Sequence, residues 1–119
     1  MLSLNGSYRF YLCREYTDLR KGFDGLSGMV RNELNRDPLS GDIFIFYNRR
    51  RNQIKLLQWE GDGFAIYFKR LEQGTYEIPD TDKKDHIELN NDSLMLILRG
   101  ISLRSIKRRK RYSMLKKTG

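Results

Sequence analysis

The hydrophobic pattern near the start of the chain predicts a strand followed by an amphipathic helix. From Ser7 to Cys13 apolar and polar positions alternate with a period of two, which is typical of a strand buried on one face. Thr17 is a suitable N-cap, and apolar residues then recur every three or four positions up to about Asn35. The apolar stripe of this helix consists of Leu19, Phe23, Leu26, Val30 and Leu34.

Three apolar runs in the middle of the chain predict an antiparallel meander. Ile43–Tyr47 is short and continuously apolar, as in a strand buried on both faces. The polar loop 48–52 separates it from Ile54–Trp59, and the turn 60–63 leads into Phe64–Lys69. Because consecutive strands joined by such short polar turns pair as hairpins, we expect these three strands to be neighbours.

Weaker patterns follow toward the C-terminus. They predict a short edge strand at Tyr76–Ile78, another strand at His86–Leu89, and a final helix from Ser93 to about Arg99. The sequence therefore predicts an α+β fold. It comprises an antiparallel meander of about four to five strands, one long helix packed on it, and a short C-terminal helix. We expect one domain, 1–103, followed by a basic tail, 104–119.

Charge changes this picture, because it is unevenly distributed. The chain has 119 residues, of which 23 are basic and 15 acidic. Eight of the basic residues follow Leu103, no acidic residue follows Asp92, and the rest of the chain is therefore neutral. A cationic end on a neutral body favours a polyanionic partner, most often nucleic acid; a solvated tail or an acidic protein partner is the alternative. The tail residues assigned to nucleic-acid contact are Arg104, Lys107, Arg108, Arg109, Lys110 and Arg111.

A second basic cluster, Arg49, Arg50 and Arg51, lies in the loop predicted to join two strands. The planar fork of arginine suits phosphate, and a hairpin tip can reach a groove of DNA. A solvated loop is an equally good interpretation, and a protein contact is a third. The nearby aromatic residues are better explained as sheet core than as a platform for stacked bases. These aromatic residues are Trp59, Phe64, Tyr67 and Phe68.

Three glycines in the predicted helix, Gly22, Gly25 and Gly28, form a bare strip beside the apolar stripe. Each glycine inside a helix costs about 0.5–1 kcal/mol relative to alanine, so the strip calls for an explanation. Close approach of another backbone within the fold is the first explanation. Contact with a partner protein or a phosphate backbone is the second, and a locally broken helix is the third.

Catalytic chemistry has little support. Asp42 and Lys55 open two strands of a predicted hairpin, as an acid and a Gln-x-Lys triplet do in some metal-dependent nucleases, but no second acid is identified. A turn residue and a surface lysine are the simpler interpretation. Cys13 and His86 are the single cysteine and the single histidine. We therefore expect no catalytic residue, metal or cofactor, and a cytoplasmic protein without a signal peptide or membrane partner.

Several segments of the chain form a recognisable combination when taken together and in order. These segments are 17–26, 37–46, 48–51, 55–64, 67–74 and 103–112. In this combination they resemble the TnpB accessory protein of insertion-sequence family 66, a group of bacterial transposable elements. The resemblance implies a role in transposition beside a separate transposase that carries the catalytic acids, and it brings no catalytic residue to this chain.

Three functions remain open at this point. The chain is a DNA-binding accessory factor, a protein adaptor that contacts the transposase, or a metal-dependent nuclease that uses Asp42 and Lys55. The first hypothesis depends on the basic tail and the arginine hairpin. The second makes the glycine strip a candidate surface.

Overall fold

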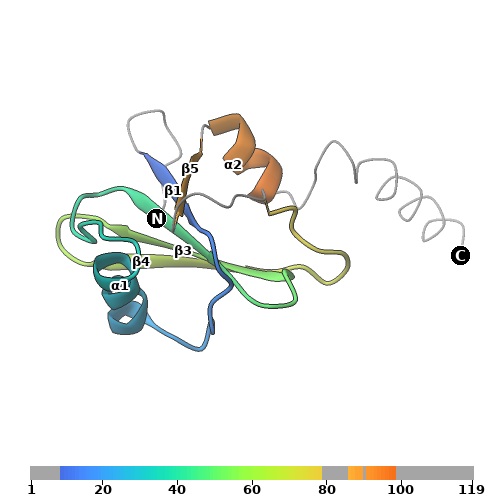
Figure 1. Cartoon of the computed structure of the whole chain (residues 1–119), viewed down its shortest axis with the longest axis horizontal. Helices are drawn as coiled ribbons and strands as arrows, with labels where there is room; N and C mark the ends of the chain where they lie inside the picture. Colours follow the sequence, from blue (N-terminus) through green and yellow to red (C-terminus); the bar gives the residue numbers. More distant parts are fainter. Residues whose placement is uncertain (1–8, 79–85, 90, 99–119) are drawn as a thin grey trace, which may run out of the picture.

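A computed structural model describes residues 9–78, 86–89 and 91–98 of the chain. The described residues form five strands and two helices (Figure 1). The order is β1 (Phe10–Cys13), α1 (Phe23–Asn32), β2 (Ile43–Tyr47), β3 (Gln53–Trp59), β4 (Phe64–Arg70), β5 (His86–Leu89) and α2 (Asn91–Leu98).

The strands form one mixed sheet in the order β4-β3-β2-β1-β5. Consecutive strands β2, β3 and β4 pair antiparallel, and β5 pairs antiparallel with β1. The predicted α+β class is confirmed, but a sheet that is antiparallel throughout is wrong, because β1 runs parallel to β2. The 29 residues between these two strands contain α1, and a crossover of this kind is what a parallel pair requires.

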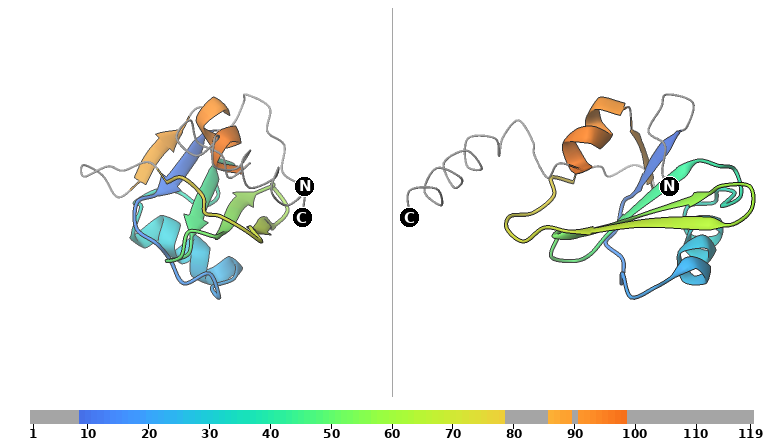
Figure 2. Two further views of the ribbon diagram at one scale, coloured as in Figure 1. Left: turned by 90° about the vertical axis from the view of Figure 1, so that its right-hand side faces the viewer. Right: turned by 180° about the vertical axis from the view of Figure 1, so that it is seen from behind.

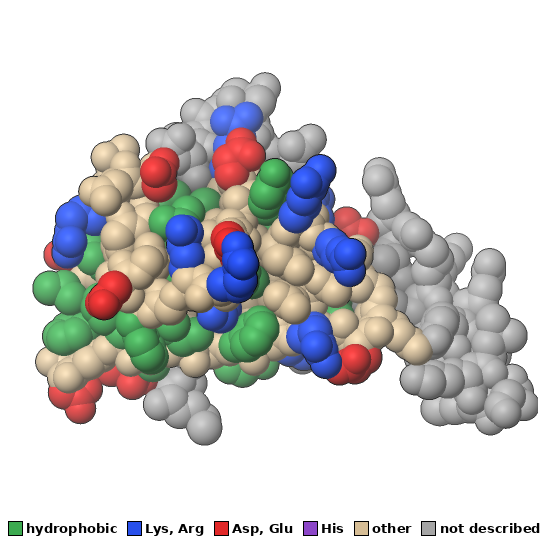
Figure 3. All heavy atoms as spheres, turned by 90° about the horizontal axis from the view of Figure 1, so that it is seen from below, with side chains coloured by type: hydrophobic (Ala, Val, Ile, Leu, Met, Phe, Trp, Pro, Cys, Tyr) green, Lys and Arg blue, Asp and Glu red, His purple; other side chains and the backbone are tan. Residues whose placement is uncertain are grey.

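Helix α1 covers one face of the sheet, and α2 lies on the other (Figures 1 and 2). On the α1 face, Leu26 and Val30 pack with Phe44, Phe46 and Leu57 of the sheet. Figure 3 shows this face from outside. Burial of each such side chain contributes about 1.5–3 kcal/mol, so packing on the sheet holds a helix of only ten residues in place.

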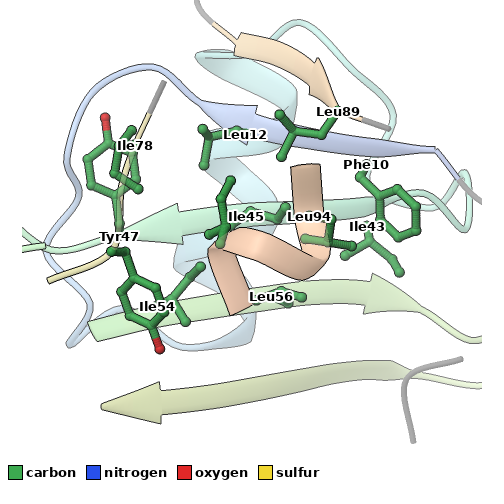
Figure 4. Close-up of a cluster of buried hydrophobic side chains, with 12 residues drawn as sticks. Phe10, Leu12, Ile43, Ile45, Tyr47, Ile54, Leu56, Ile78, Leu89 and Leu94 are labelled. Carbon is green, nitrogen blue, oxygen red and sulfur yellow. The ribbon is translucent and has the colours of Figure 1, made fainter. Parts of the chain in front are cut away.

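The opposite face has its own core, drawn in Figure 4. Leu94 and Ile97 of α2 pack there with Ile43 and Ile45 of β2, among other strand residues. All five residues of β2 are buried, as its continuous apolar run predicts. The prediction that the first strand is buried on one face only is wrong, because all four residues of β1 are buried between the two layers.

Helix α1 begins later and ends earlier than the periodicity predicts. Gly22 is its N-cap, whereas Thr17 is buried and donates its backbone N–H to the Tyr47 carbonyl at 2.8 Å. The Arg20 guanidinium binds the Asp18 carboxylate and holds the pKa of that carboxyl well below its usual range. Because of these contacts, the first turn of the predicted helix is a loop that stays attached to the sheet through Thr17.

The segment after β4 is not an edge strand, although the sequence predicts one at Tyr76–Ile78. Tyr76 is buried, and its N–H donates to the Arg51 carbonyl at 2.6 Å. Ile78 also joins the core on the α2 face, so the segment serves as a cover for the sheet. The boundary at 103 and the tail 104–119 lie outside the described residues. Within the described residues, no helix has the length and apolar character needed to cross a membrane.

Candidate nucleic-acid interface

The loop between β2 and β3 holds three exposed arginines on a well-bonded frame. The Asn48 side-chain oxygen accepts the N–H groups of Asn52 and Gln53 at 3.0 and 2.9 Å, and its amide nitrogen donates to the Asn52 side chain at 2.7 Å. The Arg51 N–H donates to the Asn48 carbonyl at 3.0 Å, which closes the turn. Asn48 therefore fixes the backbone, while Arg49, Arg50 and Arg51 extend into solvent.

Arg51 occupies a backbone conformation that residues other than glycine and asparagine rarely adopt. Its φ angle is +58°, in the left-handed region. This conformation costs a residue with a Cβ about 1–2 kcal/mol, and glycine is the usual residue after such a turn. A basic residue thus occupies a position where a glycine would be more stable.

A second loop, residues 14–17, packs beside this tip. The Tyr47 hydroxyl donates to the Arg14 carbonyl, which anchors the loop to the end of β2. The guanidinium carbon of Arg49 lies 5.9 Å from the centre of the Tyr16 ring, and Tyr16 is 54% exposed. An exposed aromatic ring beside arginines is typical of sites that bind nucleic-acid strands.

Tyr47 contacts both loops and interacts electrostatically with their charged residues. The guanidinium carbon of Arg51 lies 5.9 Å from the centre of the Tyr47 ring. Burial raises the pKa of the Tyr47 hydroxyl, whereas the positive charges of Arg51 and Arg14 act to lower it. The cationic cluster at this end of the sheet therefore includes Arg14 as well as the three arginines of the tip, with Glu15 as an acidic neighbour.

The aromatic residues of the β3–β4 hairpin do not form one platform. Trp59 packs edge-to-face on Phe64, with ring centres 5.0 Å apart, at the end of the hairpin remote from the arginines. Tyr67 and Phe68 are 41% and 53% exposed, but they are neighbours in a strand and so point to opposite faces. Lysine and arginine side chains are spread over the α1 face with hydrophobic side chains between them (Figure 3).

The strand register does not bring Asp42 and Lys55, the two residues of the nuclease hypothesis, together. Lys55 lies opposite Phe46, four residues along β2 from Asp42, which is about 13 Å at 3.3 Å per residue. Asp42 instead accepts the Arg9 N–H at 3.4 Å, and Lys55 donates to the Lys21 carbonyl at 3.0 Å. The described part of the chain holds no group of three histidine, cysteine, aspartate or glutamate residues arranged to bind a metal.

Close packing inside the fold, the first interpretation of the glycine strip, does not explain Gly22 or Gly28. A Cβ at Gly22 or Gly28 would meet no described atom within 4 Å, whereas at Gly25 it would come within 3.0 Å of the Lys21 Cβ. Gly22 is not in the helix interior either, because it is the N-cap of α1. Gly22 and Gly28 therefore leave open space beside the helix, and Gly25 has a close neighbour in Lys21.

Structure and sequence agree on part of the candidate site and differ on the rest. The structure brings Arg49, Arg50 and Arg51 together at an exposed tip, as the hairpin pattern predicts. Sequence reasoning missed Arg14 and Tyr16. The signal that could have found them is their position, because a basic and an aromatic residue follow the first strand within three positions. The side chain of His86 lies outside the described residues. The six predicted contact residues of the tail do so too: Arg104, Lys107, Arg108, Arg109, Lys110 and Arg111.

Comparison with known proteins finds one matching family and two similar proteins. The model of a protein family described as IS66 Orf2 like protein matches residues 8–108. Two uncharacterized proteins of Sinorhizobium fredii are similar along nearly their whole length. One, y4jC, is 28% identical over 109 residues, which is 92% of each chain. The other, y4hO, is 30% identical over 104 residues, which is 87% of this chain and 90% of its own. No solved structure matches.

Proposed function

We propose, from the premise that this chain belongs to the IS66 Orf2-like family of insertion-sequence accessory proteins, that it binds DNA without catalysing a reaction. In this proposal the chain helps to assemble the transposase on the ends of the element. The observation that carries the proposal is the exposed arginine tip 49–51, held by Asn48 and flanked by Tyr16.

The chemistry of the tip suits a phosphate backbone. Each guanidinium group presents several donors in a flat fork that matches two phosphate oxygens. The backbone of the tip is already fixed by the side chain of Asn48, so less conformational entropy is lost on binding. The strain at Arg51 also supports a functional role, because residues in such conformations cluster at binding sites.

Tyr16 extends the proposal from phosphates to bases. Its ring is half exposed and lies beside Arg49, so a base that leaves the double helix could stack on it. Such stacking contributes about 1–3 kcal/mol per base and depends little on sequence. We therefore infer that the tip binds backbone at duplex ends, where strands open, without reading a sequence.

The basic tail adds to this interface in the proposal. Its cations would contribute phosphate contacts that depend strongly on salt, at about −0.9 in the slope of log K against log salt for each contact. In this proposal the tip and the tail contribute to DNA affinity separately.

A titration followed by fluorescence anisotropy tests the proposal. The full chain is compared with a variant in which Arg49, Arg50 and Arg51 are alanine, on element-end and random DNA, duplex and single-stranded, at several salt concentrations. We expect the slope to become shallower by up to about 2.7, because as many as three contacts are lost. A chain that ends at Leu103 shows how much of the DNA affinity and of the salt slope the tail contributes.

The matched control loses the same charge elsewhere on the body. Arg9, Lys21 and Arg31 are exposed and lie outside the tip, and their triple alanine variant should keep most of the affinity. Equal losses in both triple variants would show that only net charge matters and would contradict a site at the tip. No binding by the full chain at low salt would reject the DNA proposal altogether.

An adaptor for the transposase is the second candidate function. The observation that favours it is the outward surface of α1, where Gly22 and Gly28 leave open space and Phe23 is half exposed. A purified transposase that binds the full chain, and loses that binding on Phe23→Ser but not on removal of the tip arginines, would establish the adaptor function.

A further inference from the structure

Strand β4 forms one edge of the sheet, and its outer side is open within the described part of the chain. It pairs with β3 along all seven of its residues, and no described strand lies on its other side. Hydrogen bonds that continue the β3–β4 pairing beyond both strand ends join Glu60 to Gly63 at 2.9 Å and Leu71 to Asn52 at 2.8 Å.

These two bonds determine which backbone groups of β4 point outward. In an antiparallel pair every second residue bonds to the neighbouring strand, so Ala65, Tyr67 and Lys69 bond to β3. The N–H and C=O groups of the alternate residues then project from the sheet edge. These alternate residues are Phe64, Ile66, Phe68 and Arg70.

The edge lacks the usual features that prevent strand pairing. Natural edge strands are blocked by proline, by bulges or by charges near their centre. β4 has no proline, its register with β3 continues without interruption, and its central positions carry the exposed rings of Tyr67 and Phe68. Charge occurs only at its ends, as Asp62 in the preceding turn and Lys69 and Arg70 at the finish.

We propose that the outer edge of β4 pairs with β4 of a second copy of this chain, antiparallel, about a two-fold axis at Ile66. In this register Phe64 lies opposite the partner's Phe68, so the most exposed ring of the strand is covered by an aromatic neighbour. Asp62 comes beside the partner's Arg70, and the same ion pair forms again at the other end of the strand.

Charge and packing favour this register over its neighbour. An axis at Tyr67 would also match outward backbone groups, but it would set Asp62 against the partner's Glu72 and Phe64 against the partner's Arg70. Arg70 is free to change its partner, because its ion pair with Glu72 is long, at 3.3 Å, and both side chains are exposed. The two sheets would then join into one sheet of ten strands.

The proposal does not depend on DNA binding, and its test is sedimentation velocity of the full chain. The protein is freed of nucleic acid and measured over a wide concentration range at constant salt. We expect a dimer whose dissociation constant rises at least tenfold in Asp62→Lys and in Arg70→Asp. The double variant, Asp62→Lys with Arg70→Asp, exchanges the two charges and should restore dimerisation.

Controls keep the test decisive. Arg31→Asp makes the same charge change on α1 and should leave the dimer intact, and circular dichroism checks that each variant is folded. If one charge variant does not fold, Phe68→Lys replaces it, because a charge at the centre of the edge should also separate the copies. A wild-type chain that stays monomeric at every concentration would overturn the proposal and leave the edge to a strand of another protein. A dimer unaffected by both charge reversals would overturn it as well.

Discussion

The turn that joins β2 to β3 and the turn that joins β3 to β4 lie at opposite ends of β3 and are built differently. Each contains a residue with positive φ, Arg51 at +58° in the first and Gly61 at +94° in the second. The β3–β4 turn thus uses glycine where the conformation demands it. The β2–β3 turn uses arginine and is stabilised by the side-chain hydrogen bonds of Asn48.

The two turns also differ in charge. The β3–β4 turn carries Glu60 and Asp62, whereas the β2–β3 turn carries three consecutive arginines. The β3–β4 turn meets the conformational demand of a hairpin with a glycine. The β2–β3 turn accepts conformational strain and like-charge repulsion, and we infer that the β2–β3 turn is shaped by binding as well as by folding.

The largest expected effect comes from removing the frame of the arginine turn. Asn48→Ala deletes three side-chain hydrogen bonds, each worth about 1 kcal/mol, and should lower the free energy of unfolding by about 3 kcal/mol. The measurement is urea denaturation. Asp62→Ala in the other turn, measured at protein concentrations where the chain is monomeric, is the control and should change stability by less than about 0.5 kcal/mol, since the side chain is exposed. Equal effects in the two turns would contradict the role of Asn48.

Substitution of either residue with positive φ should change the free energy of unfolding by an intermediate amount. The change should have opposite signs in the two turns. Arg51→Gly relieves the left-handed strain and should stabilise the protein by about 1 kcal/mol, whereas Gly61→Ala should destabilise it by about 1–2 kcal/mol. Thermal unfolding measures both. If DNA binding accounts for the arginine, Arg51→Gly should also weaken binding. A variant that is more stable and binds DNA equally well would show that the strain has no part in the proposed function.

The parts of the fold that sequence predicts well are those governed by local pattern. Ile43–Tyr47 is apolar throughout and is buried throughout, and the meander from β2 to β4 follows from short turns between apolar runs. Local pattern failed where a contact with a distant residue fixes the backbone in another conformation. Thr17 has the side chain of an N-cap, but its backbone N–H donates to the carbonyl of Tyr47, thirty positions away, and the helix starts only after Gly22.

The candidate site shows the same division. That Arg49, Arg50 and Arg51 would be exposed follows from three charges between two apolar runs. That Tyr16 would join them does not, because the contact depends on the parallel placement of β1 beside β2. The alternation of residues 7–13 suggested a half-buried strand, since nothing local indicates that a second layer covers Tyr11 and Cys13.

The smallest effect on stability should give the clearest comparison of function. Arg50 and Asp62 are both exposed residues of the two turns, so Arg50→Gln and Asp62→Asn should each change the free energy of unfolding by less than about 0.5 kcal/mol. Each variant alters the charge by one unit, in opposite directions. If the arginine turn contacts DNA, Arg50→Gln should lower affinity and make the salt slope shallower by about 0.9, while Asp62→Asn should leave the slope unchanged at protein concentrations where the chain is monomeric. Anisotropy titrations at three salt concentrations measure both slopes.

Equal slopes for the two variants would mean that Arg50 contacts no phosphate. The arginine turn would then be an exposed loop with an unusual sequence, and the search for the DNA-binding surface would move to the tail.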